Sequence, residues 1–364
     1  MKIKDITNYL EEIAPLSYQE SYDNSGYITG NPNDELKGVL ITLDTIDEIV
    51  DEAIEKNCNL IISHHPIVFK GLKKITGKNY IERTIIKAIK NDIAIYAIHT
   101  NLDNVHTGVN AMLCKKLELQ NCKILRPAKN ELRKLVTYVP EAHAEKVRNM
   151  LFETGAGHIG NYSNCSFNNS GIGTFMGNEN SNPFVGAKNK VHFERESKIE
   201  TIFPKHLENK IISELIKIHP YEEVAYDIYP LENKYMQVGA GMIGELEKEL
   251  DTIEFLKKIK KNLDAKVIRH TKIIKPKIKK VALCGGSGSF LLNDAIAQNA
   301  DIFVSGDFKY HEFFDANNKI IIADAGHYET EQFTKELIFD VLMKKNNKFA
   351  CFLSKESTNP ITYL

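Results

Sequence analysis

Histidines and carboxylates that closely follow apolar, strand-like segments are the residues of this sequence best suited to chemistry. Five of them stand near the ends of three such segments: His64, His65, Asp103, His327 and Glu331. Because ligand groups gather at the carboxyl ends of strands in open α/β sheets, we expect these side chains to meet at one sheet edge. His327 and Glu331 are four residues apart, so a helix beginning at this point would place both on one face.

Three imidazoles and two carboxylates form a ligand set for borderline or hard divalent cations, and the set needs no thiolate. Zinc is the leading ion, and iron, manganese, cobalt and nickel are alternatives that accept the same donors. Five protein ligands are too many for one catalytic ion with open positions. We therefore expect two ions per chain, about 3.5–4 Å apart and bridged by a carboxylate. Such a pair activates water, which makes hydrolysis the expected class of reaction.

Each candidate also has a purely structural interpretation. Adjacent histidines are often solvated or hydrogen-bonded side chains without a ligand. Asp103 could belong to a polar turn that caps the following helix, and Glu331 could support the dipole of a helix that begins just before it. The shared position of all five residues beyond strand ends favours the metal site.

Further polar residues lie near the same expected edge. The glycine-rich stretch 285–288 stands between an expected strand and helix, so its N–H groups could hold a phosphate; a plain tight turn is the alternative. Asp307, His311 and His99 could orient metal ligands, and His311 or Glu331 could transfer protons. For Asp307 and His311 the alternative is a capped helix with an exposed histidine.

The elements that must position these residues alternate between strands and helices. Strands are expected at 39–43, 60–62, 93–98, 280–284, 301–305 and 319–323, and helices at 45–57, 79–90, 287–298 and 330–344. Short apolar strands between amphipathic helices are typical of parallel sheets covered on both faces. We therefore interpret residues 1–127 and 237–364 as the two halves of one layered α/β domain.

Residues 128–236 interrupt this alternation. Strands are expected at 134–139, 165–176, 190–202 and 222–229, and helices at 141–153 and 205–218. This β-α-β-β-α-β order predicts a ferredoxin-like domain inserted into the first domain. Within it, Tyr221-Glu222-Glu223 could contribute to a ligand or subunit contact, or could form only a structural turn.

Composition excludes several classes of protein. The chain has 47 basic and 48 acidic residues, with 43% apolar content, as in ordinary globular proteins. Six Arg against 41 Lys argue against nucleic-acid binding. No apolar stretch is long enough for a membrane span, and the N-terminal residues lack the apolar core of a signal peptide. Six scattered cysteines without a CxxC pair predict reduced thiols in a cytoplasmic protein.

Six segments together resemble the Nif-three-like dinuclear metal-centre family, the GTP cyclohydrolase 1 type 2 homologs. They are residues 22–26, 63–66, 99–103, 285–288, 306–311 and 326–331. The segments span the two outer parts of the chain, about 250 residues. The middle resembles the PII- and CutA-like insert of the longer members, most clearly at 219–223. One departure is Tyr22, where many members have Trp.

The resemblance implies that His64, His65, Asp103, His327 and Glu331 occupy the family's metal-ligand positions. It also implies a toroidal homohexamer with the metal sites facing an internal cavity. Our leading hypothesis is a cytoplasmic divalent-metal hydrolase of a nucleotide-like or other small phosphorylated molecule, with GTP ring opening as the candidate reaction. The alternative is a metal-binding regulatory or metal-delivery protein without turnover. A DNA-binding ring is disfavoured by the balanced charge.

Overall fold

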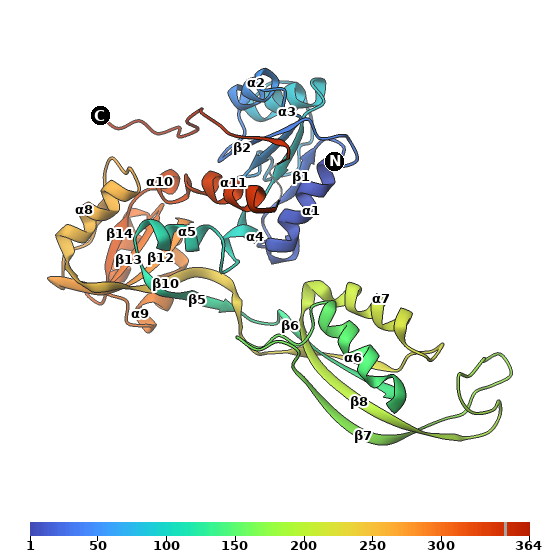
Figure 1. Cartoon of the computed structure of the whole chain (residues 1–364). Coiled ribbons are helices and arrows are strands. Elements are labelled where there is room, and N and C mark those ends of the chain that lie inside the picture. The colour runs from blue at the N-terminus through green and yellow to red at the C-terminus, as the bar shows by residue number, and fades with distance from the viewer. Residues whose placement is uncertain (346–347) are drawn as a thin grey trace. The chain divides into compact units, whose positions relative to one another are not determined.

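The computed structural model describes residues 1–345 and 348–364. They form two compact units: Met1–Pro127 together with Gln237–Leu364, and Ala128–Met236 (Figure 1). The architecture is mixed α/β with several sheets, as the alternating apolar segments predict. Among the described residues, no helix combines the length and apolar content needed to cross a bilayer. All six cysteines are free.

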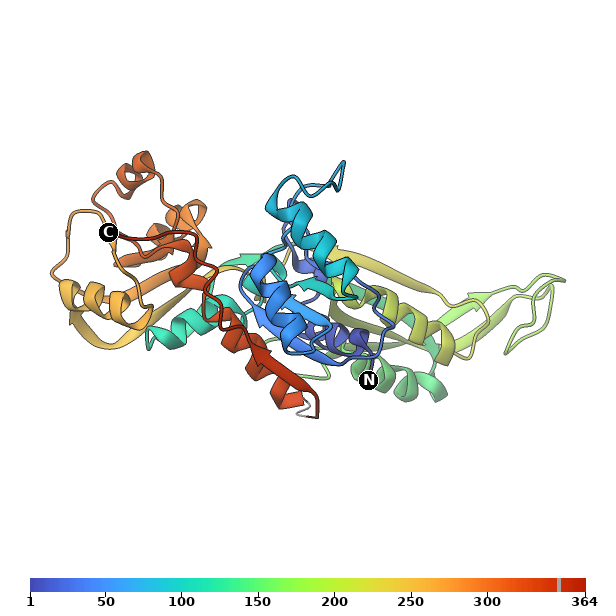
Figure 2. The same ribbon diagram turned by 90° about the horizontal axis from the view of Figure 1, so that it is seen from above.

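The first unit contains a five-stranded sheet in the order β1-β4-β3-β2-β15. Its strands are β1 (Gly26–Thr29), β2 (Gly38–Thr42), β3 (Leu60–Ser63), β4 (Ala94–Ala97) and β15 (Ala350–Leu353). All neighbours are parallel except β1, which is antiparallel to β4. Helices α2 (Asp47–Glu55) and α3 (Tyr80–Lys90) lie side by side next to this sheet (Figures 1 and 2). Strands β2, β3 and β4 are fully buried, which explains why their sequences are continuous apolar runs.

A six-stranded sheet in the order β11-β14-β13-β12-β10-β5 completes the first unit. Its strands are β5 (Gln120–Ala128), β10 (Tyr235–Asp251), β11 (Arg269–His270), β12 (Lys277–Ser287), β13 (Ile302–Gly306) and β14 (Ile321–Asp324). The neighbours β12, β13 and β14 are parallel. Along β13, Ile302 and Val304 belong to one apolar core cluster and Phe303 to another. Both faces of this strand are therefore covered.

The other helices of the first unit mostly connect or cover these strands. They are α1 (Ile3–Ile13), α4 (Thr100–Asp103), α5 (Val109–Lys116), α8 (Thr252–Asn262), α9 (Leu292–Ala297), α10 (His327–Glu331) and α11 (Thr334–Lys345). The helix expected at 287–298 is shorter, because β12 continues to Ser287 and a 3-10 turn intervenes. The helix expected at 330–344 is divided into α10 and α11.

The second unit has a four-stranded sheet in the order β7-β8-β6-β9. Its elements follow the chain as β6 (Leu132–Pro140), α6 (Ala144–Glu153), β7 (Ser166–Phe175), β8 (His192–Pro204), α7 (Glu208–Ile218) and β9 (Tyr226–Leu231). All strand pairs are antiparallel. The apolar sides of α6 and α7 pack on Leu135, Ile199 and Phe203 of the sheet to form a separate core.

One sequence-based expectation requires correction. The candidate residues do not gather at one edge of a single sheet, because the first unit contains two sheets. The strand ends that precede His64 and Asp103 belong to the five-stranded sheet, and the strand end that precedes His327 belongs to the six-stranded sheet.

Candidate metal centre

Two neighbouring strands of the five-stranded sheet end beside each other and deliver the first group of side chains. The parallel register pairs Ser63 at the end of β3 with Ala97 at the end of β4. His64 and His65 therefore emerge next to His99, and their rings lie 5.1 and 5.2 Å from the ring of His99. The short helix α4 then places Asp103 at the same site, with Oδ1 3.6 Å from His64 Nε2.

The six-stranded sheet delivers the second group through the helix that follows β14. Gly326 has a φ of 98°, which favours glycine, and α10 begins at the next residue. His327 and Glu331 lie one helical turn apart, and His327 Nε2 is 2.9 Å from Glu331 Oε2. This confirms the predicted shared helix face.

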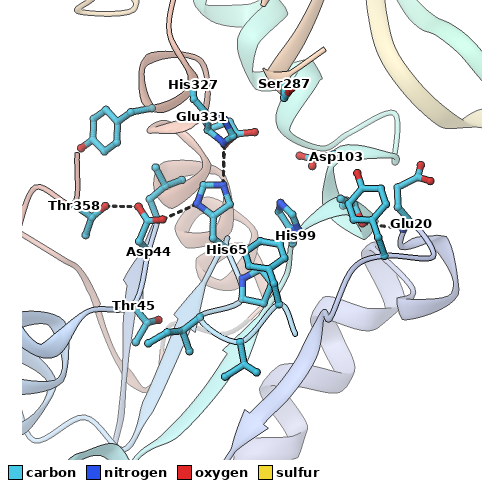
Figure 3. A pocket seen from close by; sticks show the side chains of 18 of the residues that line it. Glu20, Asp44, Thr45, His65, His99, Asp103, Ser287, His327, Glu331 and Thr358 are labelled. Atoms are coloured by element: carbon cyan, nitrogen blue, oxygen red, sulfur yellow. Dashed lines mark hydrogen bonds and ion pairs between the residues drawn. The ribbon is translucent and has the colours of Figure 1, made fainter. Parts of the chain in front are cut away.

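Glu331 lies at the centre of the assembled site (Figure 3). Its Oε2 is 3.0 Å from His65 Nε2 as well as 2.9 Å from His327 Nε2. Its Oε1 is 3.9 Å from His64 Nε2. One carboxylate therefore faces three imidazoles that come from both sheets. All five residues expected at a metal site are brought together.

The spacing of these atoms fits a divalent ion. Two donors bound to one tetrahedral ion at about 2.1 Å lie about 3.4 Å apart. The separations of 2.9 to 3.9 Å around Glu331 and His64 bracket this value, and His65 Nε2 lies 3.4 Å from His327 Nε2. Three triads have their donor atoms mutually within 4.8 Å: His64, Asp103 and Glu331; His65, His327 and Glu331; and His64, His65 and His99.

Two buried atoms at the site have no hydrogen-bond partner among the described residues. They are His64 Nε2 and Asp103 Oδ1, which point into the same space. Leaving buried polar atoms unpaired costs about 1–3 kcal/mol each. A cation that binds both atoms removes this cost, so the residues present fit a metal.

A second group of carboxylates fixes the orientation of the histidines. Asp44 Oδ1 accepts from His65 Nδ1 at 2.8 Å, and Asp307 Oδ2 is 2.7 Å from His327 Nδ1. His64 Nδ1 donates instead to the carbonyl of Ile98 at 2.9 Å. With Nδ1 occupied, each ring presents Nε2 to the site, as metal-binding histidines commonly do.

Charge is concentrated at this site. Burial alone would lower the pKa of His65, but its hydrogen bonds to Asp44 and Glu331 raise it to about 10. Burial would also lower the pKa of His327, but the neighbouring carboxylates of Glu331 and Asp307 raise it to about 11. Burial and the charge of Glu331 raise the pKa of Asp103 to about 7. The carboxylates around His65 and His327 thus favour positive charge at this site.

The glycine-rich stretch at the end of β12 makes room for Glu331. A Cβ at Gly286 would lie 2.3 Å from Glu331 Oε1, and its φ of 59° is in the left-handed region. The N–H groups of Gly285 and Gly286 donate to Asn110 and Thr330, both at 2.9 Å. These two donors are engaged within the protein, which disfavours the phosphate-binding interpretation of this stretch.

A cavity of about 1370 Å³ opens over the site. His65, His99 and Glu331 are among the residues that line it. The lining also includes the cationic and aromatic side chains of Lys70, Lys73, Lys74, Tyr22, Phe69 and Phe290. Such a lining suits a small molecule that carries both an anionic group and a flat ring.

Comparison with known proteins identifies the family. Residues 1–360 match the profile of Duf34/NIF3 (NGG1p interacting factor 3). The chain belongs to the Duf34/NIF3 family. It is 40% identical over 367 aligned positions to the GTP cyclohydrolase 1 type 2 homolog of Bacillus subtilis, with 99% of this chain and 98% of that protein covered. A protein of the same name from Staphylococcus epidermidis is 34% identical with both chains fully covered.

Two solved structures of Duf34/NIF3 relatives extend over the whole chain. A Bacillus cereus protein related to NIF3 has a TM-score of 0.88 and 38% identity, covering 100% of this chain and 99% of its own. Staphylococcus aureus protein SA1388 has a TM-score of 0.79 and 32% identity with the same coverage. This chain therefore has the same fold as both of these proteins.

Within this Duf34/NIF3 chain, one sequence-based candidate lies apart from the site. His311 is exposed on the 3-10 segment Tyr310–Ala316, and its ring stacks on Phe314 at 6.2 Å. It is absent from the described lining of the cavity. The reason is that the polypeptide turns away after Asp307, whose own carboxylate reaches His327.

Sequence analysis missed two of the carboxylates that hold histidines. Asp44 directly follows the strand at 39–43, so the strand-end argument applies to it as well. Asp23 lies in the segment 22–26, and its Oδ1 forms a hydrogen bond with His99 Nδ1 at 2.8 Å. Asp307 holds His327 as expected of a residue that orients a metal ligand, whereas the ring of His99 lies beside those of His64 and His65.

Proposed function

We propose that this chain binds two divalent metal ions and uses them to hydrolyse a small, nucleotide-like, anionic substrate. The observation that carries the proposal is the convergence of unpaired His64 Nε2 and Asp103 Oδ1 on one side of Glu331. On its other side, the Nε2 atoms of His65 and His327 converge.

Each ion would have three protein ligands. His64, Asp103 and Glu331 would hold one, and His65, His327 and Glu331 would hold the other, so Glu331 would be common to both sets. The mixture of imidazole and carboxylate favours zinc, although iron, manganese, cobalt and nickel accept the same donors. When bound, such a pair supplies Lewis acidity and lowers the pKa of water toward neutrality.

His99 is the residue best suited to move protons. Its Nδ1 is bonded to Asp23 at 2.8 Å, and the ring lines the cavity beside His65. A carboxylate behind an imidazole fixes its tautomer and its orientation. Glu331 would serve as the bridging ligand and would not also act as a base. His311 has no role in proton transfer in this proposal, because it is not among the described residues that line the cavity.

The substrate class follows from the cavity and from the family. Lys70, Lys73 and Lys74 would attract phosphate, and Tyr22, Phe69 and Phe290 offer faces for a flat ring. Relatives carry the name GTP cyclohydrolase 1 type 2 homolog, so GTP ring opening is the first reaction to test. The alternative function is metal regulation or delivery without turnover.

Metal content and turnover separate these functions. We expect about two ions per purified chain and at most about one in Glu331→Gln. The matched control is Glu336→Gln, because Glu336 lies on α11 and pairs with Lys116. GTP and a panel of small nucleotides are then assayed with each metal restored. Metal-dependent turnover supports the hydrolase, whereas metal binding without turnover supports the alternative.

We also propose the assembly and domain arrangement that the resemblance implies. Ala128–Met236 would be an inserted ferredoxin-like domain, which its β-α-β-β-α-β element order supports. The chain would form a toroidal homohexamer in the cytoplasm. Light scattering of the purified protein tests the assembly, since a particle of six chains is expected and a monomer would contradict it.

A further inference from the structure

The second unit contains a cavity of its own, independent of the metal centre. Its volume is about 510 Å³, which is in the range of small-molecule sites. The sheet provides Tyr138, Phe175 and Glu196, and the segment after α7 provides Tyr221 and Glu222. No Lys, Arg or His is among the described lining residues.

Glu196 is the residue that defines this cavity. It is only 9% exposed, and no cationic side chain pairs with it among the described residues. Its Oε1 accepts a hydrogen bond from the Tyr221 hydroxyl at 2.8 Å. Its Oε2 accepts none from the described part of the chain and lies against Gly173, where a Cβ would come within 2.1 Å. A buried carboxylate without a counter-cation is costly.

Neither His219 nor His192 neutralises Glu196. His219 Nε2 donates to the Tyr138 carbonyl at 3.0 Å, and His219 Nδ1 accepts from the Tyr221 N–H at 3.1 Å. Both nitrogens are thus used by backbone groups, and burial lowers the pKa of the ring. His192 pairs instead with Glu194, at 2.8 Å.

Aromatic rings form much of the remaining wall. The Tyr221 ring lies 5.8 Å from Phe175 and 6.4 Å from Phe184. The segment that carries Phe184 is tied to the rim, because the Asn182 N–H donates to Glu222 at 2.6 Å. Aromatic faces attract cations within about 6 Å, most strongly when the cation is desolvated. Rings around a carboxylate therefore favour an organic cation over a hydrated metal ion.

We propose that this cavity binds an organic ammonium ion, with Glu196 as its counter-charge and the rings of Tyr138, Phe175, Phe184 and Tyr221 around it. This assigns a role to His219-Pro220-Tyr221-Glu222-Glu223, which the metal centre does not explain. His219 holds the backbone of Tyr221, and the Tyr221 hydroxyl holds Glu196.

Choline is a suitable probe, titrated calorimetrically into the full-length protein. We expect saturable binding, and we expect the neutral isostere with carbon in place of nitrogen to bind at least about tenfold more weakly. Glu196→Gln removes the charge at constant size and is expected to weaken choline binding by about tenfold or more. Glu145→Gln, on the exposed side of α6, is the matched control and is expected to bind as the wild type does.

A second variant covers the case in which Glu196→Gln fails to fold. Phe184 is 53% exposed, so Phe184→Leu leaves the core intact and is expected to weaken choline binding about threefold to tenfold. The proposal is overturned if choline does not bind saturably or if its neutral isostere binds equally well. Unchanged choline affinity in a folded Glu196→Gln protein would overturn it too.

Discussion

Replacing Asp44 tests whether the hydrogen-bonded carboxylates prepare the histidines for metal. Asp44 Oδ1 holds His65 Nδ1 at 2.8 Å, and the Thr358 hydroxyl in turn donates to Asp44 Oδ2 at 2.6 Å. This arrangement leaves His65 Nε2 directed at Glu331 (Figure 3). In Asp44→Ala the ring loses its partner and can adopt the wrong tautomer or rotate.

The size of the effect follows from how well each pair is shielded from water. Losing a hydrogen-bond partner of a metal ligand typically costs 10- to 100-fold in affinity, or about 1.4–2.8 kcal/mol. We expect Asp44→Ala near the upper end, and Asp44→Asn near about tenfold because its amide oxygen can still accept the bond. For Asp307→Ala we expect about tenfold or less, since its side chain is 51% exposed.

Zinc competition against a chromogenic chelator at neutral pH measures these affinities directly. Asp51→Ala is the matched control, since Asp51 pairs with Lys87 at 2.7 Å and is 55% exposed. Thermal unfolding of each metal-free variant shows whether the fold is retained. The reasoning is refuted if folded Asp44→Ala binds zinc as tightly as Asp51→Ala.

Two further predictions concern the same centre. Gly286→Ala adds a Cβ 2.3 Å from Glu331 Oε1 at a φ of 59°. We therefore expect this variant to lose about 1–3 kcal/mol of stability and to lose bound metal. The control Gly171→Ala adds a Cβ that meets nothing within 4 Å, so thermal unfolding should show no change. Zinc binding at neutral pH should release at least about one proton per chain, because the pKa values of His65 and His327 are raised to about 10 and 11. Zinc affinity is therefore expected to rise with pH. Calorimetry in buffers of different ionisation enthalpy measures the proton release, and finding none would contradict this prediction.

The elements predicted most directly from the sequence are the strands that are buried on both faces. Continuous apolar runs at 39–43 and 60–62 become buried parallel strands, since a strand covered on both faces has no polar side. By contrast, β10 (Tyr235–Asp251) contains several glycines and charged residues and continues past the boundary of the second unit. Its strand character depends on pairing with β12, and local sequence does not reveal that pairing.

The residues of the site could be predicted from the sequence, but the sheets and supporting contacts that position them could not. Strand-end position and a spacing of four singled out His64, His65, Asp103, His327 and Glu331, which the structure brings together. That two sheets supply them depends on long-range packing. The support given by Asp23 to His99 is a contact across 76 residues, beyond the reach of spacing arguments. The role of Gly286 also depends on contact with a distant helix.

Anomalous diffraction from crystals of the zinc-loaded protein, recorded on both sides of the zinc absorption edge, tests the central proposal most directly. We predict two peaks per chain beside Glu331, one facing His64 and Asp103 and the other facing His65 and His327. Zinc-specific density elsewhere, or none between these side chains, would contradict the proposed centre.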